Sequence, residues 1–249
     1  MKIDLNCDMG EGCGNDAELM NYVSSANIAC GFHAGDYETM LKTVRTAVEK
    51  GVAIGAHPGY DDRENFGRTQ MVLSPEDVHD LVVTQVVALR EICNKVGAKL
   101  THVKPHGALY NQAAKDPALA NAIAGAVRSV DGDLLLFGLS GSVMIEEIRK
   151  CGLRSASEVF ADRTYCSDGS LTPRTQPNAL INDTETSLDQ VMQMVRDHCV
   201  TSTDGKTVPI TAETICIHGD GEHAVEFAKA IYARLQENNI DIIPCGDSL

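Results

Sequence analysis

The chain has 249 residues, of which 43% are hydrophobic and 22% charged, and its formal net charge is −14. That length and apolar content suffice for a large core, and we expect a single domain over residues 1–249. The charge disfavours nucleic acid and anionic membranes as partners, because the long-range field repels phosphate. An anionic small molecule stays compatible, since a few local Arg and Lys side chains can dominate a closed pocket.

The cysteines and the N-terminus suggest a compartment. The nine cysteines form no Cys-x-x-Cys pair, which is typical of neither a disulfide framework nor a zinc ribbon. The first residues contain no apolar signal core, and no apolar run reaches the ~18 residues of a membrane span. We therefore expect a soluble protein in the reducing cytoplasm, without membrane contact.

Strands and helices are predicted to alternate along the first half of the chain. Apolar patterning predicts strands at residues 2–7, 27–30 and 52–56. The first strand is followed by a glycine-rich turn and a short helix. Asp36 caps a second helix that ends at Gly51, and Ser74 with Pro75 begins a long helix that ends at Gly97.

The second half continues the alternation. Further strands are predicted at the start of the stretch 100–111 and at residues 133–138, 157–161, 214–217 and 240–243. Helices are predicted to begin at Asp116, Ser140 and Ser187, and a last helix runs through Phe227, Ile231 and Leu235. Residues 201–211 form a hydrophilic, hairpin-like insert. The polar loop at residues 162–183 is too long for a simple connector, and loops of that length are commonly functional.

Regular alternation of strand and helix predicts a parallel sheet with right-handed crossovers. Seven or eight such units favour a closed or nearly closed barrel, with a doubly wound sheet as the second choice. In a barrel, the carboxyl ends of all strands open onto one mouth, where active residues collect.

The stretch from Leu100 to Asn111 concentrates ionisable side chains. His102, Lys104 and His106 occupy even positions and share one face of a strand. Pro105 excludes a helical metal pair, and we expect the strand to run into a polar loop after it. A solvated basic face on an edge strand is the alternative. His102 lies deeper than Lys104 by two residues of strand rise, roughly 7 Å, and we expect it to be a core hydrogen bonder.

Six predicted strands end in groups capable of acid–base chemistry. A single terminal histidine is more often structural, but the convergence of six strand ends favours a catalytic pocket. The chemistry is predicted to be hydrolytic, because carboxylates near imidazoles exchange protons with water. The catalytic candidates are Asp8, His33, His57, Lys104, His106, Asp162 and His218.

Substrate-binding candidates surround the same mouth. Lys104 would stabilise an oxyanion or bind a phosphate. The guanidinium groups of three arginines can each donate two hydrogen bonds to a substrate carboxylate, although salt bridges within loops explain these arginines equally well. The substrate-binding set is Asn6, Glu11, Arg68, Tyr110, Arg163, Arg174 and Asp220.

Several known catalytic motifs are missing from the sequence. There is no Walker A loop, no Gly-x-Ser-x-Gly elbow and no His-Glu-x-x-His. Cys30 and Cys216 fall within strands and are expected in the core. Asp8, His33 and His57 are suitable in type for zinc or a related ion, but their spacing alone leaves the presence of a metal unknown.

Seven motifs in a fixed order carry a resemblance to a known family. They occupy residues 4–12, 25–36, 55–58, 63–68, 103–110, 158–163 and 217–220. The chain resembles the LamB/YcsF lactam-utilisation family from Met1 to about Ile243. The departures are slight: Cys7 and Cys13 stand where small residues are usual, and the insert at 201–211 is variable.

The resemblance implies a distorted seven-stranded, TIM-like β/α barrel, similar to the glycoside hydrolase/deacetylase superfamily. It also implies an ATP-dependent 5-oxoprolinase formed with two partner subunits, B and C. That assembly cleaves 5-oxoproline (pyroglutamate) to L-glutamate while hydrolysing ATP, a co-substrate that acts with Mg²⁺, to ADP and phosphate. Two alternatives remain open: a metal-dependent deacetylase or amidohydrolase, and a non-catalytic subunit that binds a metabolite.

Overall fold

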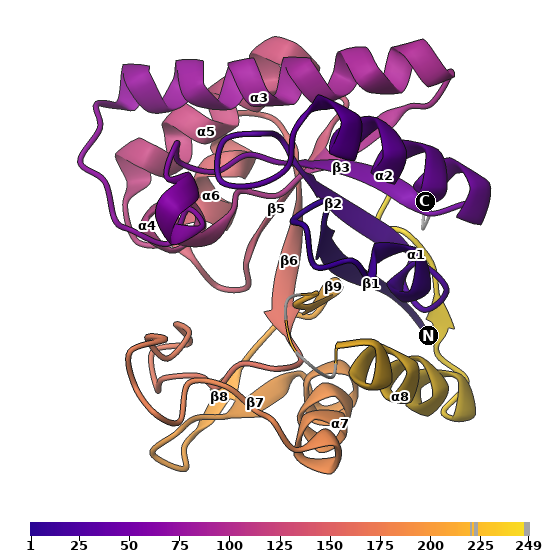
Figure 1. Cartoon of the computed structure of the whole chain (residues 1–249). Coiled ribbons are helices and arrows are strands. Elements are labelled where there is room, and N and C mark those ends of the chain that lie inside the picture. The colour runs from indigo at the N-terminus through magenta and orange to yellow at the C-terminus, as the bar shows by residue number, and fades with distance from the viewer. Residues whose placement is uncertain (220, 222–223, 247–249) are drawn as a thin grey trace.

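Seven parallel strands close into a barrel in the computed structural model, which describes residues 1–219, 221 and 224–246 (Figure 1). The sheet order is β1-β2-β3-β4-β5-β6-β9, and β9 pairs with β1 to complete the ring. The strands are β1 (Lys2–Met9), β2 (Ser25–Ala29), β3 (Ala53–His57), β4 (Leu100–Val103), β5 (Leu135–Leu139), β6 (Arg154–Phe160) and β9 (Thr214–Ile217). The predicted β/α barrel is confirmed, and the doubly wound sheet is excluded.

Helices connect the strands and surround the barrel (Figure 1). They are α1 (Asp16–Leu19), α2 (Tyr37–Lys50), α3 (Pro75–Val96), α4 (Gly107–Ala113), α5 (Pro117–Val130), α6 (Val143–Lys150), α7 (Thr184–Met192) and α8 (Ala224–Glu237). Within the described residues, no helix is long and apolar enough to cross a membrane.

Two small β elements lie outside the ring. The strands β7 (Cys199–Thr201) and β8 (Thr207–Pro209) form an antiparallel hairpin, which confirms the hairpin-like insert. The strand β10 (Asp241–Ile242) pairs in parallel with the start of β1. The last predicted strand is therefore present, but it is shorter than expected and extends the barrel wall at one end.

The predicted helix caps explain where α2 and α3 begin and end. The Asp36 carboxylate accepts a hydrogen bond from the Thr39 amide, and the Ser74 hydroxyl accepts one from the Asp77 amide. Gly51 ends α2 in the left-handed region with φ of 68°, which costs a glycine little because it has no Cβ. Local sequence signals therefore determine these two boundaries.

Two local predictions were wrong. Ser140 does not cap α6, which begins at Val143; the Ser140 hydroxyl instead accepts a hydrogen bond from the Thr211 amide, 71 residues away. The predicted polar loop after Pro105 is the helix α4, which begins at Gly107. Seven residues are too few for a helical period to be distinguished in the sequence.

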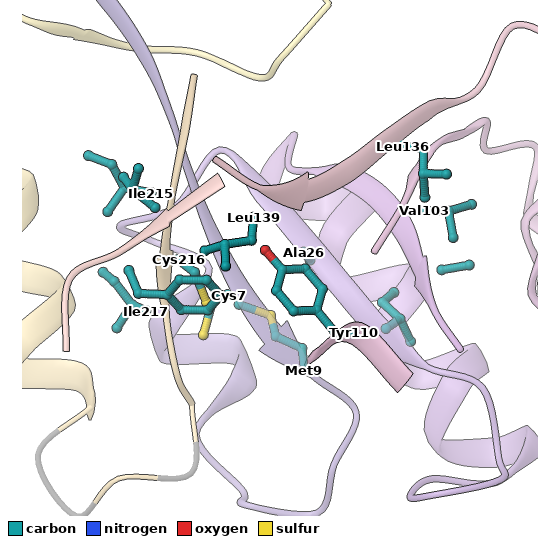
Figure 2. Packing of buried hydrophobic residues seen from close by; sticks show 14 of the residues in the cluster. Cys7, Met9, Ala26, Val103, Tyr110, Leu136, Leu139, Ile215, Cys216 and Ile217 are labelled. Atoms are coloured by element: carbon teal, nitrogen blue, oxygen red, sulfur yellow. The ribbon is translucent and has the colours of Figure 1, made fainter. Parts of the chain in front are cut away.

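Apolar side chains from the strands and helices form the core. Figure 2 shows part of it, including Cys7 and Met9 of β1, Cys216 of β9 and Tyr110 of α4. Cys30 and Cys216 are buried, as predicted for core cysteines. The Tyr110 ring places an apolar body in this core while its hydroxyl stays available for polar contacts.

A buried carboxylate at the amino-terminal end of β1 makes stability depend on pH. Asp4 accepts hydrogen bonds from the hydroxyls of Ser24, Ser25 and Thr214. Burial raises the pKa of Asp4 to about 6, although these hydrogen bonds lower it. The folded chain therefore holds this proton more tightly than the unfolded chain, and the associated stability is lost as the pH rises through about 6.

We expect the wild type to lose about 1 kcal/mol of unfolding free energy, relative to Asp4→Asn, between about pH 5 and pH 7. Urea unfolding of both proteins at the two pH values measures this difference, and comparison with the variant cancels the titration of other groups. A difference that does not change with pH would show that Asp4 titrates normally.

Candidate active site

A pocket of about 690 Å³ opens at the carboxyl ends of the strands, where the barrel mouth was predicted. The predicted site residues that line it are Asp8, Glu11, His57, Arg68, Lys104, His106, Tyr110, Arg163, Arg174 and His218. His33 and Asp162 contact lining residues, and Asn6 lies beneath the pocket. Asp220 lies outside the described residues. The structure therefore brings the strand-end groups together.

Lys104 is a buried cation at the centre of the pocket floor, only 2% exposed. Its Nζ lies 2.9 Å from Asp8 Oδ1 and 2.9 Å from Glu158 Oε1, and it donates to Cys216 Sγ at 3.1 Å. Burial lowers the pKa of Lys104, but Asp8, Cys216 and Glu158 outweigh it and hold the pKa well above its ordinary value. The ammonium is therefore a fixed positive charge.

Glu158 is a site residue that the sequence prediction missed. It has no exposed surface on β6, and its Oε1 also accepts a hydrogen bond from Asn6 Nδ2 at 3.0 Å. Its Oε2 and the Tyr110 hydroxyl are both buried without a hydrogen bond among the described residues. Burial and the Glu158 carboxylate raise the pKa of Tyr110 well above its ordinary value. The available signal for Glu158 was its place in the predicted strand 157–161, where it shares one face with Phe160 and with Asp162 at the strand end.

Asn6 supports this arrangement from below. Its amide donates to Glu158 and to Thr214, and its Oδ1 accepts from Asn27 and from Lys104. These bonds use the two donors and the two lone pairs that the side chain offers. The geometry therefore makes Asn6 a positioning residue for Lys104 and Glu158.

His102 is a buried hydrogen bonder, as its depth in the strand predicted. It is 2% exposed, and its Nε2 lies 2.9 Å from Asn27 Oδ1, to which it donates. Burial lowers the pKa of His102 to about 3, so the ring is neutral. It therefore stays outside the set of catalytic candidates.

His57 and Asp8 form the first carboxylate–imidazole pair. The distance from His57 Nε2 to Asp8 Oδ2 is 3.4 Å, and His57 Nδ1 lies 2.6 Å from the Lys104 carbonyl. Burial lowers the pKa of His57, but Asp8 outweighs it and the pKa is raised. Burial raises the pKa of Asp8, yet His57 and Lys104 bring it well below its ordinary value.

His218 and Asp162 form a second pair across the pocket. His218 Nδ1 lies 2.8 Å from Asp162 Oδ2, so this nitrogen donates and Nε2 is left as the acceptor. The Phe160 ring stacks on the imidazole with a centroid distance of 5.6 Å. Burial raises the pKa of Asp162, but the facing His218 outweighs it and lowers the pKa.

His33 and His106 stack face to face beside Glu11. Their ring centroids are 3.8 Å apart with an interplanar angle of 2°. Burial, followed by the neighbouring His57, lowers the pKa of His33 to about 3 and that of His106 well below its ordinary value. Gly67 lies so close that an added Cβ would stand 2.8 Å from His33 and 2.9 Å from His106. The glycine therefore makes room for the stacked rings.

The three arginines that were predicted to bind a substrate carboxylate differ in their surroundings. Arg163 is buried and donates to the carbonyls of Thr172 and Ala179, which fastens the long polar loop. The Arg68 guanidinium lies 4.9 Å above the Phe66 ring at the pocket rim. Arg174 lines the same rim. Arg68 and Arg174 are therefore the better placed of the three to meet a substrate carboxylate.

A set of metal-ligand side chains lies at one edge of the pocket. One ligand atom from each of Glu11, His33, His57 and His106 lies within 4.8 Å of the others. This set keeps His33 and His57 of the sequence-based one and has Glu11 and His106 in place of Asp8. A second cluster joins Asp8, Cys216 and His218.

The arrangement is suited to hydrolysis at a carbonyl or an activated carbonyl. A fixed ammonium stabilises negative charge on a reacting oxygen, and its desolvated position strengthens that effect. An imidazole oriented by a carboxylate takes a proton from water and returns it to a leaving group. Among the described residues, His218 with Asp162 has this arrangement, while the carbonyl of Lys104 orients His57 and leaves its Nε2 facing Asp8.

Comparisons with known proteins place this geometry in a family. The chain matches the LamB/YcsF family over residues 3–249. It is 56% identical over 244 residues to a Geobacillus kaustophilus protein named as the A subunit of 5-oxoprolinase, covering 96% of this chain and 95% of the relative.

Solved structures agree with this match. A lactam utilization protein from Thermus thermophilus has a TM-score of 0.92 at 44% identity, over 98% of this chain and 99% of that chain. A polysaccharide deacetylase from Bacillus cereus has a TM-score of 0.52 at 14% identity, over 100% and 95% of the two chains, which shows a shared deacetylase-like fold. Together with the motifs around the pocket, these matches show that the chain belongs to the LamB/YcsF family.

Proposed function

We propose that this chain is the lactam-opening component of an ATP-dependent 5-oxoprolinase that works with two partner subunits, B and C. The complex would convert 5-oxoproline, ATP and two waters into L-glutamate, ADP and phosphate. The observation that carries the proposal is the buried Lys104, held between two carboxylates in a pocket that His57 and His218 also line, in a chain 56% identical to a protein named as the A subunit of 5-oxoprolinase.

The chemistry explains why ATP would be needed. A five-membered lactam is a stable amide whose carbon is a poor electrophile. Transfer of the terminal phosphoryl group of ATP to the lactam oxygen releases ADP and makes that carbon electrophilic. Water then adds to the carbon, and the C–N bond breaks as the nitrogen takes up a proton. The resulting acyl phosphate reacts with a second water to give glutamate and phosphate.

The pocket residues have natural roles in the ring-opening steps. His218 Nε2 is oriented by Asp162 to accept a proton from water and to return it to the ring nitrogen. Lys104 stabilises the negative charge that develops on the oxygens of the attacked carbon. Arg68 and Arg174 at the rim would hold the carboxylate of 5-oxoproline.

We assign phosphorylation mainly to the partners, because the sequence contains no Walker A loop. The test is ATP-dependent formation of glutamate from 5-oxoproline, measured for this chain alone, for the partners alone and for the complete mixture. We expect full turnover only in the mixture. Full-rate hydrolysis of both ATP and 5-oxoproline by this chain alone would refute the division of labour.

The metal-ligand cluster favours one second candidate, a metal-dependent amidohydrolase. Such an enzyme would need no ATP. Turnover of 5-oxoproline or of an N-acetylated substrate without ATP, abolished by chelation, would favour this candidate over the proposed function. A complete mixture whose turnover is unchanged when Asp8 or Lys104 is replaced would instead favour a non-catalytic subunit.

A further inference from the structure

Two imidazoles at the pocket edge are anchored by backbone carbonyls. His57 Nδ1 lies 2.6 Å from the Lys104 carbonyl oxygen, and His106 Nε2 lies 2.8 Å from the Phe66 carbonyl oxygen. A carbonyl only accepts, so each of these nitrogens must carry a proton. Metal-bound histidines commonly donate their outer N–H to a carbonyl in this way, which fixes the tautomer and the ring orientation.

The anchored rings point their other nitrogens at each other. His57 Nε2 and His106 Nδ1 are 2.9 Å apart. When both rings are neutral, two lone pairs meet at this distance, which is unfavourable. Two species resolve the conflict: an extra proton on one ring, or a cation that both lone pairs bind.

Glu11 and His33 lie next to the facing nitrogens of His57 and His106. Glu11 Oε1 lies 3.2 Å from His33 Nε2, 3.3 Å from His106 Nδ1 and 3.8 Å from His57 Nε2. The Glu11 side chain is only 4% exposed. In a tetrahedral site with bonds of about 2.1 Å, neighbouring ligand atoms are roughly 3.4 Å apart. The observed separations therefore bracket the spacing of a zinc-type site.

We propose that Glu11, His33, His57 and His106 bind one divalent transition-metal ion of the zinc type. Three imidazoles and one carboxylate favour such an ion over Mg²⁺ or Ca²⁺, which prefer oxygen ligands. The four ligands come from the loop after β1, the loop after β2, the end of β3 and the residue that precedes α4. The ion would lie beside Asp8, within the pocket, and its binding does not depend on the proposed reaction.

The test uses the full chain, stripped with a chelator at neutral pH and then dialysed against Co²⁺ or Zn²⁺. We expect one bound equivalent by elemental analysis, and the visible absorption of a four-coordinate Co²⁺ site. His106→Ala and the conservative Glu11→Gln should each weaken metal binding about tenfold or more. His79→Ala is the matched control, because His79 lies at the surface of α3 with Asp80 as its partner, and it should bind metal like the wild type.

Two results would overturn the proposal. The first is a folded wild type, verified by circular dichroism, that binds no stoichiometric Zn²⁺ or Co²⁺. An extra proton on His57 or His106 would then explain the short distance between their facing nitrogens. The second is a strong thiolate-to-cobalt charge-transfer band that disappears in Cys216→Ser, which would place the ion at the Asp8, Cys216 and His218 cluster instead. Both readouts are independent of turnover, so loss of the proposed 5-oxoprolinase activity would not affect them.

Discussion

Replacing Lys104 with Met is expected to lower glutamate formation by the complete 5-oxoprolinase mixture about 10³-fold and to cost about 3–5 kcal/mol of unfolding free energy. Both effects follow from the same burial. The ammonium is the partner of Asp8 and Glu158, so its removal leaves two buried carboxylates without a cation. The measurements are the coupled assay and urea unfolding at neutral pH.

Lys150→Met is the matched control for this prediction. Lys150 also pairs with a glutamate, Glu147, but its side chain is 63% exposed, so water screens the pair and its loss should leave both the free energy of unfolding and the turnover close to those of the wild type. The double variant Lys104→Met/Glu158→Gln should recover part of the stability and none of the activity. Wild-type turnover in Lys104→Met would contradict a catalytic role for the ammonium.

Replacing Asp162 with Asn is expected to lower kcat by about 10²–10⁴-fold with little change in KM. The carboxylate accepts the Nδ1 proton of His218 and thereby leaves Nε2 free to take a proton from water. An amide in its place can donate to Nδ1, which stabilises the opposite tautomer and puts the proton on Nε2. Steady-state kinetics of the complete mixture at saturating ATP measure this effect.

Asp168→Asn provides the control on the same long loop. Asp168 is exposed and binds Ser170 rather than an imidazole, so we expect turnover within about twofold of the wild type. A kcat for Asp162→Asn as high as that of Asp168→Asn would show that His218 does not need its carboxylate, and would remove it from the proposed mechanism.

The barrel was predictable because its signals are local and repeated. Caps such as Asp36 and Ser74, glycine stops and short apolar strands recur in order, and alternation alone then determines the parallel arrangement. The errors arose where a signal was too short or was overridden by distant contacts. The helix α4 has seven residues, and Ser140 binds a backbone amide 71 residues away.

The location of the site was predictable, but its internal pairing was not. Barrel geometry gathers strand ends, so His57, Lys104 and His218 could be expected together. The sequence does not contain the distances that decide which carboxylate binds which cation. Glu158 was missed because it lies on the strand itself, and Arg163 turned out to fasten a loop because two carbonyls lie within its reach.

The hydrogen bonds of Asn6 have a consequence for how the chain acquires its activity. They connect β1 with β2, β6 and β9, and the contact with Thr214 joins residues 208 positions apart. Such distant contacts form late in folding, because the intervening chain must first be ordered. Lys104 donates to the Oδ1 of this same amide, and its other partners Asp8, Glu158 and Cys216 come from β1, β6 and β9. Closure of the ring and assembly of the reactive groups are therefore one event, and a fragment that lacks β9 should carry no partial activity.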